Sequence, residues 1–528
     1  MHESTLLFVL LAAVLAVAAV AKRLKLPYPI AFVIGGSLLA FFPNLPRFQL
    51  DPNWVFLLIL PPLLFAGGWY TDWVLFRKNL RPIGLLSIGL VIATTVAVAA
   101  VTHALVPAIG WAAAFTLGAI VSPPDAVAAG AVFERFSIPR RILAILDGEG
   151  LVNDATALVI YRFAIVATLS GAFSLANASV AFVFVSVGGI ALGLLFAYAY
   201  VQVVRFMRHL EVNDYLLDNV LSLLAPYAVY LATDAISIGG IGPSAVLATV
   251  TAGVAISRSS NKIFDPDARL VAGSVWSLLI FLLNGLVFLA IGLQLREIVH
   301  DPAFALRELW IGVAISLLVI AVRVLWVFPA TYIPRWLWPS IDRREGKVTP
   351  DYVFVIAWSG MRGIVSLAAA LALPLDFPAR NVIVFITFCV IFATLVVQGL
   401  SLIPILKWLR IVSNDDMERR EIEVRVKALQ AGLKRLRALE SGFDSVEEWE
   451  VEGRIIGEYE YRIAHLTGHL EESASGGAPA VAVDHRFQEE ALTAERHEVT
   501  RMRAEGEIPD EIYRKIEYDL DLAHARLS

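Results

Sequence analysis

The sequence contains thirteen runs of 16 to 32 mostly apolar residues, separated by short polar stretches. A helix needs about 20 such residues to cross a bilayer. The chain is 58% hydrophobic and 17% charged, whereas soluble proteins are about 25% charged. The runs therefore predict an all-α polytopic membrane protein with about thirteen transmembrane helices. Their approximate bounds are 4–21, 28–43, 53–73, 82–104, 108–133, 138–169, 176–204, 214–235, 240–257, 270–295, 308–331, 350–374 and 381–408.

Positive charges are distributed unequally between the two sets of loops. With the N-terminus outside, the inner loops carry eighteen Lys and Arg residues and the outer loops carry four. Lys and Arg are enriched in cytoplasmic loops, and the cluster Lys22, Arg23 and Lys25 follows the first run, unlike the order in a signal peptide. We expect a multi-pass protein of the cell (inner) membrane, with its N-terminus outside and its C-terminal tail in the cytoplasm.

The composition changes near residue 410. Residues 1–410 carry 27 Lys/Arg and 21 Asp/Glu, whereas residues 411–528 carry 16 and 27. The chain is therefore divided into a transmembrane domain, 1–410, and a charged helical cytoplasmic tail, 411–528. In the tail, 413–472 and 486–525 have helical periodicity and 473–479 is a linker. A regulatory or dimer-contact domain and a solvated helical appendage remain equal alternatives for the tail.

Ionisable residues within the runs carry the functional information, because each costs about 2.5–3.5 kcal/mol at the bilayer centre. In the fifth run, Ser122-Pro-Pro-Asp125 has two consecutive prolines that remove backbone donors. A broken helix with a carboxylate at the break is typical of a transporter's cation site. Asp125 could also simply cap the following half-helix, and both roles can hold together. The apolar parts of the runs contain seven such residues, Asp125, Asp147, Glu149, Asp154, Arg162, Arg323 and Arg362.

The sixth run concentrates acidic residues. Asp147, Glu149 and Asp154 lie within eight residues, and Glu149 and Asn153 share one helix face at a spacing of four. Such carboxylates need a proton, a cation or a positive side chain. Arg362 in the twelfth run is the candidate, and it must meet carboxylates or exposed helix C-terminal carbonyls. We predict Glu149 as its main partner, with Asp125 as the alternative, so that Asp154 remains free to titrate.

These residues belong to a motif. Gly148-Glu149-Gly-Leu-Val-Asn153-Asp154 resembles the "GESLLND" signature of monovalent cation:proton antiporters of the sodium/proton exchanger type, in their bacterial-like branch. The resemblance covers about residues 5–410, so that 1–410 would be the antiporter domain, and it excludes the tail. The other stretches that agree, in order, are Leu60–Phe65, Ser122–Val127, Pro139–Arg141, Asn284–Phe288 with Gly292, Gly360–Gly363 and Thr394–Gly399.

The resemblance implies a homodimer whose protomers have a dimerisation part and a mobile core part that moves like an elevator. It implies inverted repeats with two crossed broken helices, and the broken runs five and twelve are seven apart and opposite in direction, as such repeats require. By motif, Asp154 would bind the cation and the proton, Asp125 would lie at the helix crossing as a second metal ligand, and Asn153 would be their neighbour. Glu149 and Arg362 would form a structural ion pair.

Three positions depart from the family pattern, and one of them is Ala66, where some members have an acid. Gly150 and Pro124 stand where many members have Ser and Thr. Two hydroxyl ligands are therefore absent, which leaves the choice between Na⁺, K⁺ and Li⁺ open.

One carboxylate can bind either a proton or a dehydrated cation, but not both. If the core reorients only when that carboxylate is neutralised, each crossing carries one of the two, and the exchange of cation for proton is obligatory. Asn153, in place of a second acid, favours one cation per proton and electroneutral transport. The sequence thus predicts Na⁺ (or K⁺ or Li⁺) exchange for H⁺ in pH and cation homeostasis. The expected partners are these ions, membrane lipid and a second copy, without nucleic acid, cofactor or enzyme activity. A cation channel and an organic-anion symporter on a related broken-helix core are the alternatives.

Overall fold

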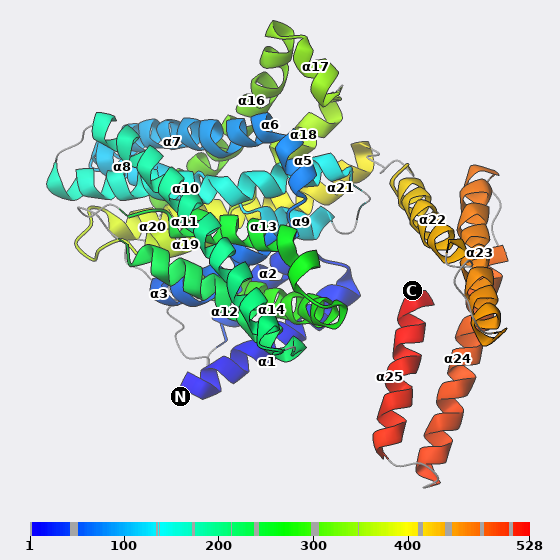
Figure 1. Ribbon diagram of the computed structural model, residues 1–528. Helices are drawn as coiled ribbons and strands as arrows, with labels where there is room; N and C mark the ends of the chain where they lie inside the picture. Colours follow the sequence, from blue (N-terminus) through cyan, green and yellow to red (C-terminus); the bar gives the residue numbers. More distant parts are fainter. Residues whose placement is uncertain are drawn as a thin grey trace. The chain divides into compact units, whose positions relative to one another are not determined.

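All regular elements in the described part of the chain are helices (Figure 1). The chain divides into two compact units, Met1–Val412 and Ser413–Ser528. The computed structural model describes residues 3–42, 51–133, 136, 138–171, 175–212, 214–236, 242–296, 306–346, 348–409, 416–438, 446–475, 480–505 and 510–527.

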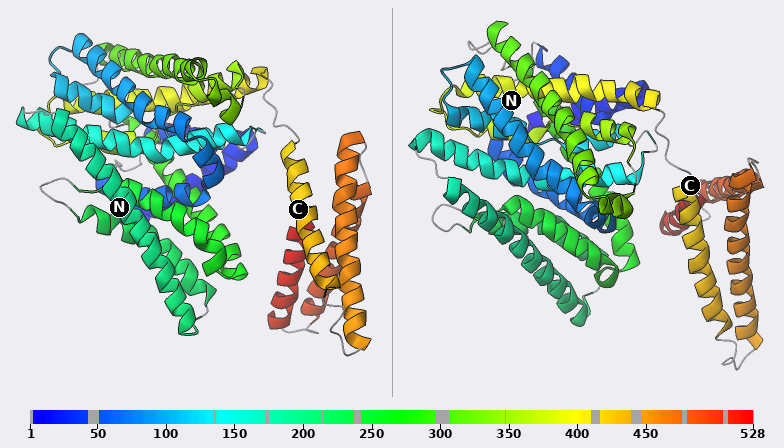
Figure 2. Two further views of the ribbon diagram at one scale, coloured as in Figure 1. Left: turned by 45° about the horizontal axis from the view of Figure 1, so that its top comes forward. Right: turned by 90° about the horizontal axis from the view of Figure 1, so that it is seen from above.

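In its described residues, the first unit is a bundle of α-helices with three π-helical segments (η1 to η3). In Figures 1 and 2, α7, α8 and α10 run side by side, in agreement with their packing contacts. The elements are α1 Glu3–Leu24, α2 Tyr28–Ala40, α3 Pro52–Trp54, η1 Val55–Ile59, α4 Leu60–Tyr70, α5 Trp73–Lys78, α6 Leu80–Gly84, η2 Leu85–Leu90, α7 Val91–Leu105, α8 Trp111–Val121, α9 Ala126–Phe133, α10 Arg140–Ser170, α11 Leu175–His209, α12 Tyr215–Asp234, α13 Ala245–Ile263, α14 Pro266–Leu293, α16 Leu306–Leu337, α17 Ser340–Glu345, α18 Pro350–Trp358, α19 Ile364–Leu371, α20 Arg380–Phe392, η3 Ala393–Gln398 and α21 Gly399–Leu409.

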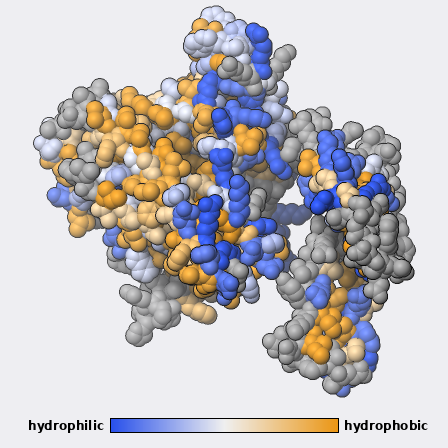
Figure 3. All heavy atoms as spheres, in the orientation of Figure 1, coloured by the Kyte–Doolittle hydropathy of each residue, from blue (hydrophilic) through white to orange (hydrophobic). Residues whose placement is uncertain are grey.

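Nine helical segments in the described residues are long and apolar enough to cross a bilayer. Their outward side chains are apolar too: on α11, Val180, Val183 and Val187 are all more than half exposed. Figure 3 shows apolar residues over much of the visible face of this unit. The first unit is therefore that of a multi-pass membrane protein. The segments are Pro52–Tyr70, Leu80–Leu105, Trp111–Phe133, Arg140–Ser170, Ala178–His209, Tyr215–Asp234, Pro266–Leu293, Leu306–Leu337 and Arg380–Leu409.

Two of the predicted spans are interrupted. α8 ends at Val121 and α9 begins at Ala126, because the prolines between them lack the N–H groups that would continue the helix. α18 ends at Trp358 and α19 begins at Ile364. The two interruptions touch, since the backbone N–H of Asp125 donates to the carbonyl oxygen of Met361 at 2.6 Å. Backbone groups freed by one break are thus satisfied by the other.

The second unit consists of two helical hairpins (Figure 2), and it differs from the predicted pair of long helices. α22, Asp416–Arg437, packs against α23, Val446–Ser475, and Arg437 is paired with Glu460 at 2.5 Å. α24, Ala480–Ala504, packs against α25, Asp510–Leu527. The helix expected over 413–472 is therefore two helices, and α23 continues into the predicted linker. The rest of that linker, 476–479, lies outside the described residues.

Candidate functional site

α10 carries the acidic residues of the signature motif. Glu149 is 1% exposed and Asn153 is fully buried, whereas Asp154 is partly exposed and Asp147 is exposed. The helical spacing that predicted a shared face for Glu149 and Asn153 holds, because α10 runs unbroken through the motif. Glu149 and Asn153 thus face protein, while Asp147 faces outward.

Glu149 forms an ion pair with Arg323 of α16, and the predicted pairing with Arg362 is corrected. Arg323 Nη1 donates to Glu149 Oε1 at 2.6 Å and Nη2 donates to Oε2 at 2.8 Å. Arg323 also donates to the carbonyl oxygen of Ile356 on α18. Both partners are buried. Such bidentate, charge-assisted bonds are strong and directional, so this pair ties α10 to α16 and α18.

Arg362 instead neutralises broken helix ends. Its Nε donates to the carbonyl oxygen of Val121 at 3.1 Å, and Nη2 donates to that of Ser122 at 3.4 Å. Its Nη1 donates to the carbonyl oxygen of Gly360. These acceptors lie where α8 and α18 end, and helix C-termini carry partial negative charge. Arg362 therefore binds helix C-terminal carbonyl groups, which is one of the two kinds of partner that the sequence predicts for it. Among the described residues, neither Glu149 nor Asp125 forms an ion pair with Arg362.

Asp125 lies at the contact between the two breaks. Its Oδ1 accepts a hydrogen bond from the backbone N–H of Val127 at 2.9 Å, so the carboxylate caps α9. A Cβ on Gly363 would overlap the Asp125 carboxylate. Glycine at 363 is thus what lets the second interruption approach this side chain. The structure places Asp125 at the contact between the two interruptions.

Asn153 joins α10 to the first break. Its Nδ2 donates to the carbonyl oxygen of Pro124 at 2.7 Å. Its other polar atom, Oδ1, is buried, and no donor to it exists among the residues that the structure describes. A buried acceptor without a donor is costly. Asn153 therefore contributes one oxygen that a proton donor or a cation could satisfy.

Asp154 is close enough to Asp125 for their charges to interact. In the described part of the chain, no hydrogen bond to the Asp154 carboxylate is present. Gly150, one turn earlier, packs so tightly on α9 that a Cβ there would lie 2.6 Å from the Cβ of Ala126. The small residue at 150 thus brings α10 close to the helix that begins beside Asp125.

The described residues contain no group of three or more His, Cys, Asp or Glu side chains that could hold a metal ion. Two carboxylates and one amide oxygen make a sparser set. Tight metal sites in proteins use more ligands of higher charge than this set provides.

Two residues near the site were not assigned a role from the sequence. Arg323 was visible as a charge within the eleventh span, but nothing local identified its partner, 174 residues away. The Oγ1 of Thr394 accepts a hydrogen bond from the backbone N–H of Arg362 at 3.1 Å. Thr394 appeared only as part of a matching stretch.

The chain matches the model of the sodium/hydrogen exchanger family, transmembrane part, over residues 9–408. It is 36% identical over 394 residues to the sodium, potassium, lithium and rubidium/H(+) antiporter of Bacillus subtilis (strain 168), which covers 72% of this chain and 58% of that protein. It is 31% identical over 530 residues to the uncharacterized Na(+)/H(+) exchanger YjcE of Escherichia coli (strain K12), covering 95% and 94%.

A solved structure has the same fold. The sodium proton antiporter MjNhaP1 from Methanocaldococcus jannaschii superposes with a TM-score of 0.60 at 18% identity, over 77% of this chain and 98% of that one. These likenesses cover the stretch in which the motifs were found, and they confirm the predicted resemblance.

Proposed function

Because the chain belongs to the sodium/hydrogen exchanger family, we propose that it exchanges a monovalent cation for a proton across the cell membrane, in pH and cation homeostasis. The observation that carries the proposal is the contrast on α10: Glu149 is neutralised by Arg323, whereas Asp154 faces Asp125 without a positive partner or a hydrogen-bond donor among the described residues. Such a carboxylate favours a proton or a cation as its counter-charge.

The ion site consists of Asp154, Asp125 and Asn153. Asp154 supplies the titrating carboxylate, Asp125 supplies a second carboxylate at the crossing, and Asn153 supplies the buried Oδ1. A proton on Asp154 removes the charge that holds the cation, so the two ligands compete. If the core crosses the membrane only when the charge of Asp154 is neutralised, each crossing carries one ligand or the other.

We propose thirteen membrane crossings arranged as inverted repeats. The nine long segments are supplemented by α1, the short apolar helices Tyr28–Ala40 and Ala245–Ser260, and the α18–α19 pair. The α8–α9 and α18–α19 pairs are then two broken helices that cross at Asp125 and Met361. The loop charges support an outside N-terminus and a cytoplasmic tail, and the family supports a homodimer.

The amide at 153 supports an electroneutral exchange of one cation for one proton. The proposed site has two carboxylates, Asp154 and Asp125, and Asp125 is already engaged as the cap of α9. Asn153→Asp should add a further carboxylate next to Pro124. We expect this variant to make exchange sensitive to membrane potential, which flux at imposed voltages would reveal.

Two observations bear on the choice of cation. The Bacillus subtilis relative is named for Na⁺, K⁺, Li⁺ and Rb⁺, and the alignment spans 58% of its length. The two hydroxyl ligands that many members have are replaced by Gly150 and Pro124. We propose Na⁺ as the main substrate, with K⁺ and Li⁺ accepted.

Proteoliposomes with a trapped pH dye test the proposal. Imposed Na⁺, K⁺ or Li⁺ gradients should drive proton flux in the wild type and none in Asp154→Asn. Asp147→Asn is the matched control, because Asp147 is an exposed acid on the same helix. Wild-type flux in Asp154→Asn, or equal loss in both variants, would sink the assignment.

A further inference from the structure

A second cluster of charges lies apart from the ion site. Glu345, at the end of α17, accepts hydrogen bonds from three arginines. Arg81 on α6 donates from Nε and Nη2, both at 2.8 Å, and Arg335 on α16 donates from Nη2 at 2.7 Å. Arg141 on α10 donates to the side chain at 3.4 Å and to the carbonyl oxygen of Glu345. The proposed exchange uses none of these groups.

A cavity of about 130 Å³ adjoins the cluster and is lined by the same three arginines. Most of its other lining residues are apolar, such as Ile142 of α10 and Val327 of α16. Its volume corresponds to about four water molecules, and it lies below the roughly 300 Å³ at which small-molecule pockets begin. A single phosphate-sized group fits this space, and a whole nucleotide does not.

The arginines retain hydrogen-bonding capacity toward such a group. The buried Nη1 of Arg81 has no acceptor among the residues that the structure describes. The three guanidinium groups carry three positive charges, and Glu345 supplies one negative charge. Planar guanidinium groups match the oxygens of a phosphate better than any other side chain does. An anion with several acceptor oxygens therefore suits the arginine side of the cavity.

We propose that this cavity binds a phosphate group through Arg81, Arg141 and Arg335, and that Glu345 occupies these arginines when the phosphate is absent. An anionic lipid headgroup and free inorganic phosphate present the same chemistry. In either case the phosphate displaces the Glu345 carboxylate, and α17 is released from α6 and α10.

Thermal unfolding of the purified full-length protein in detergent tests the binding. The arms are inorganic phosphate against chloride at matched ionic strength, and phosphatidylglycerol against phosphatidylcholine. A rise in unfolding temperature with inorganic phosphate identifies a free anion, and a rise with phosphatidylglycerol alone identifies a lipid. Either result supports the proposal. No rise beyond chloride and phosphatidylcholine overturns it.

Variants test the competition with Glu345. Glu345→Gln removes the internal competitor and should lower the half-saturating concentration of the anion about tenfold, the scale of one charge-assisted hydrogen bond. Glu421→Gln is the matched control, because Glu421 is paired with Arg425 at an exposed position in the tail, and it should bind as the wild type does. Unchanged or weaker binding in Glu345→Gln overturns the role of Glu345.

A gain of affinity cannot come from misfolding. If Glu345→Gln fails to fold, Arg81→Lys tests the site instead. This substitution keeps the positive charge at position 81 and removes the planar guanidinium group. It should weaken binding about tenfold. Equal affinity in Arg81→Lys and the wild type contradicts the site.

Discussion

Glu149 and Asp154 lie five residues apart on α10, and their surroundings differ completely. Glu149 is 1% exposed and accepts hydrogen bonds from both terminal nitrogens, Nη1 and Nη2, of Arg323. Asp154 faces another carboxylate and receives no hydrogen bond from the described residues. One helix thus contains an acid that is paired with an arginine and an acid for which the described residues provide no such partner. On this difference we base the proposal that Glu149 is a structural charge and Asp154 a functional one.

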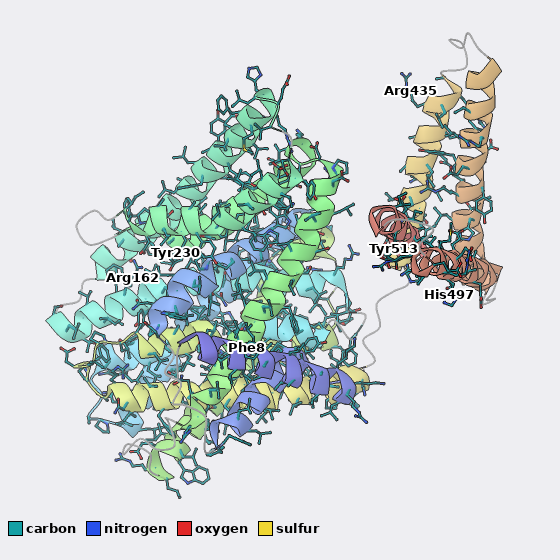
Figure 4. The ribbon with its side chains drawn as sticks, turned by 90° about the horizontal axis from the view of Figure 1, so that it is seen from below. Phe8, Arg162, Tyr230, Arg435, His497 and Tyr513 are labelled. Atoms are coloured by element: carbon teal, nitrogen blue, oxygen red, sulfur yellow. The ribbon has the colours of Figure 1, made fainter. Side chains whose placement is uncertain are left out.

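The largest expected effect comes from breaking the permanent pair. Arg323→Ala leaves Glu149 buried and unpaired, which should lower the free energy of unfolding by about 3–5 kcal/mol. Thermal unfolding in detergent measures it. Arg162→Ala is the control, since Arg162 and Asp234 are 4.0 Å apart and mostly exposed. Arg162 lies near Tyr230 of α12 in Figure 4.

For the control we expect a change within about 1 kcal/mol. Equal destabilisation by the two substitutions would mean that the Arg323 pair is no more structural than a surface contact.

The next test neutralises each acid in turn. Glu149→Gln should destabilise the protein by about 3 kcal/mol, because Arg323 loses its counter-charge in the interior. Asp154→Asn should leave stability unchanged or raise it, because it removes an unpaired charge from a mostly buried site. Comparing the two unfolding temperatures under one condition measures the contrast. A stability loss in Asp154→Asn as large as that in Glu149→Gln would erase the distinction.

A smaller effect is expected where α10 approaches the first broken helix. Gly150→Ala places a Cβ against Ala126 and should cost about 1–3 kcal/mol by overpacking. Gly130→Ala, on α9 itself, meets no atom within 4 Å and should be neutral or stabilising. Differential unfolding of the two variants measures this contact. The same stability in both would show that α10 does not need a glycine here.

The smallest effect concerns Glu345, a neutralised acid outside the spans. Burial would raise the pKa of Glu345, but the hydrogen bonds and charge of Arg81, with Arg335 and Arg141, outweigh it and hold that pKa below its ordinary value of 4.5. A lowered folded-state pKa means that this stabilisation is complete above about pH 4.5 and is lost as the pH falls further.

The difference in unfolding temperature between wild type and Glu345→Gln, in phosphate-free buffer, should therefore be constant from neutral pH down to about pH 5 and should shrink below that. A difference that already shrinks near neutral pH would contradict the lowered pKa.

The sequence predicted what local spacing and composition determine. Helical periodicity placed Glu149, Asn153 and Asp154 on α10, and the two prolines predicted the interruption before Asp125. The partner of Glu149 could not be predicted in this way. Arg323 and Arg362 are both buried charges in late spans, and only the packing of α16 against α18 decides which one reaches the carboxylate.

The single helix predicted over residues 413–472 of the tail was wrong for a different reason. The periodicity of 413–472 is continuous in charge and hydropathy, yet α22 ends at Arg437 and α23 begins at Val446. The pair Ser441-Gly442 between them was the available turn signal. Antiparallel packing of α22 on α23 then outweighs the continuity of the helical pattern, since most helix stability comes from a packed apolar face.

Competition between the cation and the proton at Asp154 is tested most directly by cation binding measured as a function of pH. Calorimetric titration of the purified protein with Na⁺ should give an apparent affinity that weakens about tenfold per pH unit once Asp154 is protonated, with one proton released per cation bound. Asp154→Asn should bind no cation at any pH. A wild-type affinity that does not change with pH, or retained binding in Asp154→Asn, would contradict exchange at this carboxylate.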